Sequence, residues 1–259
     1  MPKKIRLDKA LLEAGLAADE REAKGLILSG KVKLNGQLCD KPGTMVLPDA
    51  EITTIEQKKY VSRGGLKLEA ALAEFEINPS NKICADAGCS TGGFTEVLLK
   101  FGAKKIFAID TAYGELDWNL RESPNVEVME RCNVLELSKL PELVDLLTVD
   151  LSLLSSKLIL PVIKNWLKET GEIVFLLKPQ YELDSDKVPE GGIIKDTEIH
   201  KKVLLDFLEI SAKNSLFPFN IIKSPIKGGQ GNTEFLIGIK KQAVQFDAEK
   251  LIEQVLLNE

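Results

Sequence analysis

The sequence is poor in the residues that build metal centres and disulfide frameworks. It contains one histidine and four cysteines among 259 residues, and no two cysteines stand in a CxxC pair. A structural zinc site needs four nitrogen or sulfur ligands at characteristic spacings, so the sequence predicts no metal. The scattered cysteines are expected to be reduced thiols, as is typical of a cytoplasmic protein.

Long apolar runs are missing as well. No window approaches the ~20 apolar residues that a membrane-spanning helix needs, and the N-terminus shows no signal-peptide pattern. We therefore expect a cytoplasmic protein without stable membrane association.

A strong excess of positive charge is also absent, because the net charge is −5. The charge is uneven, however. Residues 1–60 carry 11 Lys and Arg against 9 Asp and Glu, whereas the rest of the chain carries 23 against 30. A local basic surface in the first part is therefore compatible with nucleic-acid binding.

Cap and turn signals divide the chain into two domains. The first is expected to hold two short helices, the second of them with Asp19 as N-cap, Glu22 as its capping-box partner and Gly30 after its end. Asn35-Gly36 then predicts a hairpin. We assign residues 1–59 to the first domain, 60–65 to a linker, 66–243 to the second domain and 244–259 to a helical tail. The basic, glycine-containing linker is interpreted as either a hinge or a plain connector.

The second domain alternates strands and helices. Strands are expected at 83–86, 105–110, 126–130, 143–150, 172–178, 218–224 and 234–240, with helical patterns between the first six. This alternation predicts a doubly wound α/β sheet, mostly parallel. The last strand closely follows a glycine-rich turn, so it is expected to run antiparallel.

The strongest motif joins the first of these strands to a helix. It contains the candidate cofactor residues Asp86, Gly88, Ser90, Thr91, Gly92, Gly93 and Phe94. Glycines allow close approach of a ligand, and the helix N-terminus favours an anion. Asp86 would repel a pyrophosphate but would attract an ammonium, which favours S-adenosylmethionine over a dinucleotide. A dehydrogenase of the Rossmann type stays open from these residues alone.

The ends of the following strands add further candidates. Asp110 is placed to accept hydrogen bonds from ribose hydroxyls, and Asn133 is placed to contact an adenine ring. Asp150 ends the fourth strand, where it would also border the cofactor.

Four charged residues are expected to meet at this edge of the sheet, because ligands bind beyond the carboxyl ends of the strands. They are Lys67, Asp150, Lys178 and Glu234. Such a group suits methylation of a ribose hydroxyl: an ammonium stabilises a developing alkoxide, and a neutral amine can accept the proton. The alternative is a set of structural ion pairs.

The chain resembles the TlyA family of haemolysin A-like rRNA methyltransferases. The resemblance rests on Arg6-Leu7-Asp8-Lys9 and Gly30-Lys31-Val32-Lys33 in the first domain, and on Ser62-Arg63-Gly64-Gly65 and Lys178-Pro179-Gln180 in the second. It implies an S4 RNA-binding domain followed by an FtsJ-like methyltransferase domain. It further implies a Lys-Asp-Lys-Glu catalytic tetrad on the four residues above and 2′-O-methylation of cytidine in ribosomal RNA.

Ribosomal RNA or a ribosomal subunit is thus the expected partner. Candidate phosphate contacts are Arg6, Lys9, Arg21, Lys24, Lys31, Lys33 and Arg63. His200, at the start of a predicted helix, is expected to cap it on the surface. Two other functions stay open: a membrane-active haemolysin, and a non-catalytic S4-containing ribosome-assembly factor.

Overall fold

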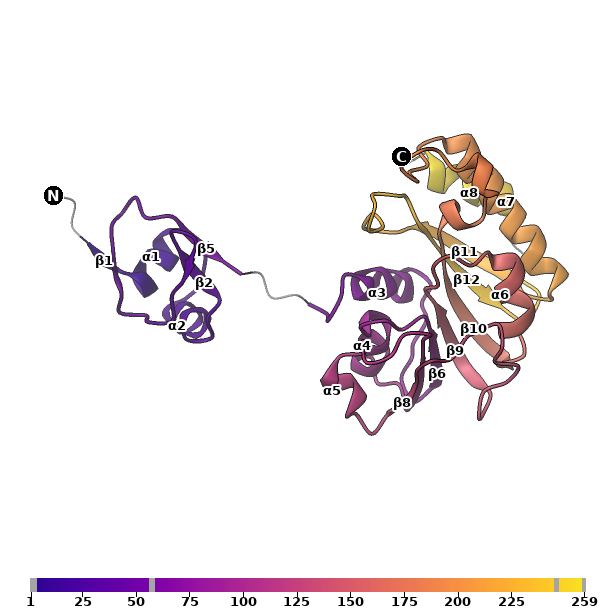
Figure 1. Ribbon diagram of the computed structural model, residues 1–259, viewed down its shortest axis with the longest axis horizontal. Coiled ribbons are helices and arrows are strands. Elements are labelled where there is room, and N and C mark those ends of the chain that lie inside the picture. The colour runs from indigo at the N-terminus through magenta and orange to yellow at the C-terminus, as the bar shows by residue number, and fades with distance from the viewer. Residues whose placement is uncertain (1–3, 56–58, 245–246, 258–259) are drawn as a thin grey trace. The chain divides into compact units, whose positions relative to one another are not determined.

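The computed structural model describes residues 4–55, 59–244 and 247–257 (Figure 1). The chain divides into two compact units, Met1–Lys58 and Lys59–Glu259. The last residues of the expected first domain, 56–58, lie outside the described residues.

The first unit combines two helices with short strands. Its elements are β1 (Ile5–Arg6), α1 (Leu7–Glu13), α2 (Glu20–Leu28), β2 (Val32–Leu34), β3 (Gln37–Leu38), β4 (Met45–Val46) and β5 (Ile52–Thr54). The Asp19 side chain accepts from the Glu22 amide at 2.8 Å, so the predicted cap is present. Asn35 and Gly36 have φ of +49° and +79°, as the tight turn between β2 and β3 requires. Leu7, Leu11 and Ile27 are fully buried and anchor the core.

The second unit is built on one large sheet. Its elements are α3 (Gly64–Glu74), β6 (Ile83–Ala87), α4 (Gly93–Lys100), β7 (Lys105–Ile109), α5 (Trp118–Arg121), β8 (Val126–Met129), β9 (Val144–Val149), α6 (Ser156–Ile163), β10 (Leu167–Leu177), the 3₁₀ turns Pro179–Tyr181 and Ser185–Lys187, α7 (Thr197–Lys213), β11 (Phe217–Lys223), β12 (Phe235–Lys240) and α8 (Ala248–Leu256). The strand order is β11-β12-β10-β9-β6-β7-β8, and β12 is antiparallel to both neighbours. The other neighbouring strands pair in parallel. This confirms the doubly wound α/β fold with an antiparallel last strand.

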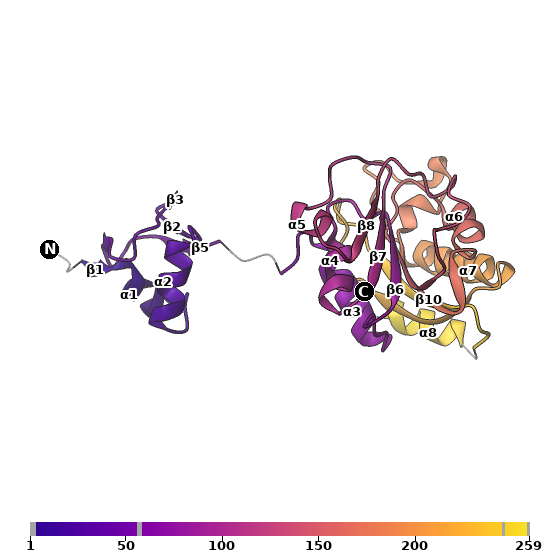
Figure 2. The same ribbon diagram turned by 90° about the horizontal axis from the view of Figure 1, so that it is seen from below.

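Helices cover both faces of this sheet (Figure 2). Helices α3, α4 and α5 lie on one face, and α6, α7 and α8 lie on the other. Two apolar cores result, one containing Leu68 and Leu98, the other containing Phe207 and Ile252. The predicted tail helix, α8, thus packs into the second core. Within the described ranges, no helix is both long and apolar enough to cross a membrane.

The helix expected between β8 and β9 is absent, and that prediction was wrong. Residues 130–143 form turns and irregular structure instead. Asn133 Oδ1 accepts from the Leu135 amide at 3.0 Å, which favours a turn, and Pro141 disfavours helix for the residue before it. The segment still buries Val134 and Leu140, and Trp166 Nε1 donates to the Leu137 carbonyl at 2.9 Å. The spacing of apolar residues in this segment therefore resembles that of a helix, although the segment buries them in an irregular conformation.

The predicted linker, residues 60–65, lies within the second unit. Tyr60 is 4% exposed, and a Cβ on Gly65 would lie 2.3 Å from its ring. The Val61 amide donates to Glu96 Oε2 at 2.5 Å. Residues 60–63 are therefore packed against the start of the second unit, and Gly64 and Gly65 already belong to α3.

Candidate active site

Two cavities meet at the carboxyl edge of the parallel strands. The larger, about 510 Å³, is lined by Asp110, Asn133 and Leu154 among others. The smaller, about 240 Å³, is lined by residues that include Ser62, Arg63, Lys67, Thr91, Phe94 and Ile226. Gly88, Ser90 and Asp150 line both. A ligand in one cavity would therefore face a ligand in the other across Asp150.

The glycine loop between β6 and α4 is held against its surroundings too closely for a side chain. Gly88 has φ of +87°, and a Cβ there would lie 2.4 Å from the Asp150 carbonyl oxygen. Gly92 has φ of +99° and is the N-cap of α4. A Cβ on Gly93 would lie 2.1 Å from Ser62 Oγ. The loop is thus fixed between the end of β9 and the start of α3.

Asp110 and Asn133 border the larger cavity, as their positions after β7 and β8 predicted. Asp110 Oδ2 accepts from the Ser90 amide and Oδ1 from the Ala112 amide, each at 2.8 Å. Asp110 therefore ties the glycine loop to the loop after β7. The Asn133 Nδ2 donates to Glu136 Oε1 at 3.2 Å.

Asp86 and Gly92 line neither cavity, which corrects the expected role of Asp86 as a direct ligand of an ammonium. Asp86 is fully buried, and its carboxylate accepts from Thr95 Oγ1 at 2.6 Å and from Thr148 Oγ1 at 2.9 Å. Burial raises the pKa of Asp86 to about 7. Strand pairing explains the contact, because Asp86 stands opposite Thr148 in the β6–β9 register. Asp86 joins β6, β9 and α4 beneath the loop.

Lys178 and Asp150 form the ion pair that their strand ends predicted. Lys178 Nζ lies 2.7 Å from Asp150 Oδ1 and 3.0 Å from Ser152 Oγ. Lys178 itself does not line either cavity, but both of its partners line the larger one. The ammonium group of Lys178 therefore contacts Asp150, the residue that lines both cavities, without lining a cavity itself.

Lys67 and Glu234 form a second pair at the same edge, with Lys67 Nζ 2.5 Å from Glu234 Oε2. Their side chains are 11% and 4% exposed. A Cβ on Gly228 would lie 2.5 Å from Glu234 Oε1, so the 224–233 loop covers this carboxylate closely. Lys67 lines the smaller cavity from α3, and Glu234 holds it from the start of β12. The four expected residues thus come together as two pairs.

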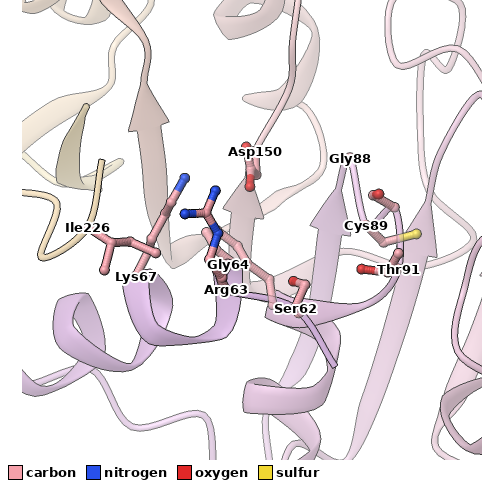
Figure 3. A pocket seen from close by; sticks show the side chains of 12 residues that line it. Ser62, Arg63, Gly64, Lys67, Gly88, Cys89, Thr91, Asp150 and Ile226 are labelled. Atoms are coloured by element: carbon pink, nitrogen blue, oxygen red, sulfur yellow. The ribbon is translucent and has the colours of Figure 1, made fainter. Parts of the chain in front are cut away.

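Arg63 shares the smaller cavity with Lys67. Figure 3 shows both side chains rising from the start of α3, with Asp150 and Ile226 on either side of them. Arg63 is exposed, so this candidate phosphate contact is accessible from solvent.

Sequence reasoning missed Glu182, which fastens the loop after β10 to the start of α6. Its carboxylate accepts from Ser155 Oγ at 2.8 Å, from the Ser156 amide at 2.8 Å and from Ser156 Oγ at 2.9 Å. The loops that carry Lys178 and Ser152 are thereby joined. The two serines at the N-terminus of α6 were the available signal, because serine side chains and free amides there bind carboxylates.

The candidate RNA contacts of the first unit are accessible in differing degree. Arg6, Lys9, Arg21 and Lys24 are exposed, whereas Lys31 and Lys33 are partly buried. Arg6 pairs with Asp8 at 2.6 Å, and Lys24 pairs with Glu20 at 3.4 Å. The positive charges of Arg6 and Lys24 are thus partly neutralised by neighbouring carboxylates.

His200 does not cap a surface helix, so that expectation was wrong. It is 1% exposed, and its ring packs edge-on against Phe235 with centroids 5.5 Å apart. Asp196 is the N-cap instead, accepting from the Glu198 amide at 2.9 Å. His200 lies one turn further on, where α7 faces β12.

Comparisons with known proteins agree with this architecture. Residues 5–52 match the S4 domain, and residues 60–241 match the FtsJ-like methyltransferase family. YqxC of Bacillus subtilis, named for rRNA methyltransferase activity, is 39% identical over 98% of this chain and 92% of its own. The 16S/23S rRNA (cytidine-2′-O)-methyltransferase TlyA of Mycobacterium tuberculosis is 35% identical over 99% of this chain and 97% of its own. A solved structure from Streptococcus thermophilus that carries a haemolysin name is 35% identical, with a TM-score of 0.74 over 100% of this chain and 96% of its own.

Proposed function

Because this chain belongs to the TlyA family of FtsJ-like methyltransferases with an N-terminal S4 domain, we propose that it 2′-O-methylates cytidine in ribosomal RNA, using S-adenosylmethionine. It acts in the cytoplasm on ribosomal RNA or ribosomal subunits. The observation that carries the proposal is Asp150, which borders both cavities and is ion-paired to Lys178. A donor and an acceptor would meet there.

The larger cavity has the chemistry that S-adenosylmethionine requires. Asp110 suits the ribose hydroxyls, while Asn133 and Leu154 offer a polar edge and an apolar face to the adenine ring. Gly88 and Ser90 bring backbone close to the amino-acid end, beside the N-terminus of α4. When bound, this cofactor supplies a methyl group on a positively charged sulfur, which is already a strong electrophile.

The protein must therefore prepare the ribose oxygen. We place the target 2′-hydroxyl in the smaller cavity against Asp150, with Lys178 behind it. The ammonium of Lys178 stabilises negative charge on the oxygen as its proton leaves, and a carboxylate oxygen of Asp150 accepts that proton. Ser152 holds Lys178 at this point, and the hydrogen bonds from Ser155 and Ser156 to Glu182, which we call the Glu182 brace, fix the loop that carries it.

Lys67 and Arg63 serve the target nucleotide in this scheme. Both line the smaller cavity and present positive charge to it. Glu234 fixes Lys67 in place through a short, well-buried contact. The basic residues of the first unit contact RNA phosphates elsewhere, which positions the substrate without reading its sequence.

Transfer of labelled methyl groups tests the proposal. Ribosomal subunits from a strain lacking this gene are incubated with protein and methyl-labelled S-adenosylmethionine, and the rRNA is mapped by mass spectrometry. We expect each added methyl on the 2′-oxygen of a cytidine ribose, in one ribosomal subunit or in both. Label on a base, or none at all, would contradict the proposal.

The other two functions give different outcomes in parallel assays. An assembly factor would bind subunits but show no heat of binding with S-adenosylmethionine. A haemolysin would release dye from liposomes at neutral pH. For the proposed enzyme we expect cofactor binding and no dye release.

A further inference from the structure

A third cavity, about 320 Å³, lies beside the 224–233 loop and is not used by the reaction described above. Its lining includes three lysines, Lys195, Lys223 and Lys227, together with the hydroxyl-bearing Thr233. No Asp or Glu stands among the described residues that line it. Lysine side chains that line one small cavity favour the binding of a compact anion.

Hydrogen bonds link the loops that form this cavity. Asn232, 1% exposed, accepts from the Ile194 amide and donates to the Gly192 carbonyl, each at 2.8 Å. Its amide thus joins the loop that carries Lys195 to the loop that carries Lys227. Lys227 Nζ donates to Thr233 Oγ1 at 2.6 Å, which orients its ammonium toward the cavity wall.

Within the described part of the chain, neither Lys195 nor Lys227 is ion-paired, and both are exposed. Asp196, the nearest acid in sequence to Lys195, is engaged as the N-cap of α7. An incoming anion would therefore meet accessible positive charge, which for Lys227 is already oriented by Thr233.

The same loop separates this cavity from the smaller cavity of the active site. Ile226 lines the smaller cavity, and the next residue, Lys227, lines the third. At the other end of the loop, Thr233 lines the third cavity and the next residue, Glu234, holds Lys67. An RNA chain with one nucleotide in the smaller cavity would therefore have its neighbouring nucleotides close to Lys195 and Lys227.

We propose that this lysine cavity binds a backbone phosphate of the RNA close to the target nucleotide. The inference rests on the proposed function, since it takes the substrate to be RNA. Lysine acts here as a point charge, so the contact strengthens binding without selecting a base. A phosphate fixed beside the 224–233 loop would hold the target sugar in register with Asp150.

The double variant Lys195→Ala/Lys227→Ala tests the proposal, with Lys213→Ala/Lys250→Ala as a control of equal charge change. Lys213 is in the last turn of α7 and Lys250 is in α8, and neither lines the cavity. Binding to ribosomal subunits is measured over a range of salt concentrations, alongside kcat, KM and cofactor affinity.

We expect the double variant to bind subunits roughly tenfold more weakly and to lose about 1 from the slope of log affinity against log salt. Its KM for subunits should rise by a similar factor, with kcat and cofactor affinity within about twofold. Lys195→Arg/Lys227→Arg should restore binding. Binding equal to that of the control, or a fall in kcat at unchanged subunit affinity, would overturn the inference. Failure of the proposed function would appear separately, as absence of methyl transfer by the unaltered protein.

Discussion

The two lysine–carboxylate pairs at the sheet edge use the same chemistry in different surroundings. Asp150 is 23% exposed and borders both cavities, whereas Glu234 is 4% exposed and is covered by the 224–233 loop. The first pair joins two neighbouring strands at the junction of the two cavities. The second joins α3 to β12 and presents only its lysine to a cavity. In the proposed mechanism, the reaction is therefore given to the first pair and a supporting role to the second.

Removing the lysine of the first pair should have the largest effect on turnover. We expect Lys178→Ala to lower the single-turnover rate about 10³-fold, because the developing charge on oxygen loses its partner. Cofactor affinity by calorimetry should change less than threefold, since Lys178 does not line the larger cavity. Lys213→Ala, far along α7, is the matched control. A rate within tenfold of the unaltered enzyme would remove Lys178 from the mechanism.

The variant Lys178→Arg distinguishes two possible roles of Lys178, proton uptake and charge stabilisation. It keeps positive charge beside Asp150 but cannot take up a proton, because guanidinium stays protonated. A rate as low as that of Lys178→Ala would assign proton uptake to Lys178. Recovery to within about tenfold would assign it charge stabilisation and leave the proton to Asp150.

The second pair should matter more for stability. We expect Lys67→Ala and Glu234→Ala each to lower the free energy of unfolding by about 3 kcal/mol, because each leaves a buried charge unpaired. Lys67→Met/Glu234→Leu should recover much of this loss, while the rate stays roughly 10²-fold low. Both tryptophans, Trp118 and Trp166, lie in the second unit, so their fluorescence reports its unfolding in urea. If Lys178→Ala destabilised this unit more than Lys67→Ala, the comparison would be reversed.

Much of this site could be predicted from the sequence because it follows from strand ends. Parallel strands deliver their last residues to one edge, so the sequence alone predicts that Asp110, Asp150 and Lys178 lie at the same edge of the sheet. The glycine loop could also be predicted, because a position where the backbone approaches its surroundings closely accepts few residues other than glycine. Both signals are local, and the topology that combines them is common to the fold class.

Long-range partners set the limit of that prediction. Asp86 lies near the end of a strand, as Asp150 does. Its carboxylate, however, accepts hydrogen bonds from Thr148, 62 residues away in sequence, and from Thr95. The Glu182 brace crosses 26 residues to Ser156. No local pattern distinguishes an acid that will find buried hydroxyls from one that will face a cavity.

Asp86 also differs from Asp150 in the expected effect of its substitution, which changes the pH dependence of stability and not the methylation rate. Its pKa of about 7 in the folded protein is above its ordinary value of 3.8, and burial is the main cause. The folded state therefore holds a proton that the unfolded state has released, so this group destabilises the fold increasingly as pH rises from about 4 to about 7. Between pH 5 and pH 8 the added cost is about 2–3 kcal/mol.

Asp86→Asn should remove that pH dependence, because an amide does not titrate. We expect the difference in unfolding free energy between variant and unaltered protein to shift in favour of the variant by that amount from pH 5 to pH 8, measured by tryptophan fluorescence in urea. The methylation rate should change less than about threefold, since Asp86 borders neither cavity. A variant with unaltered pH dependence would show that Asp86 is ionised when buried, and a variant unable to bind S-adenosylmethionine would restore the direct ligand role first expected for it.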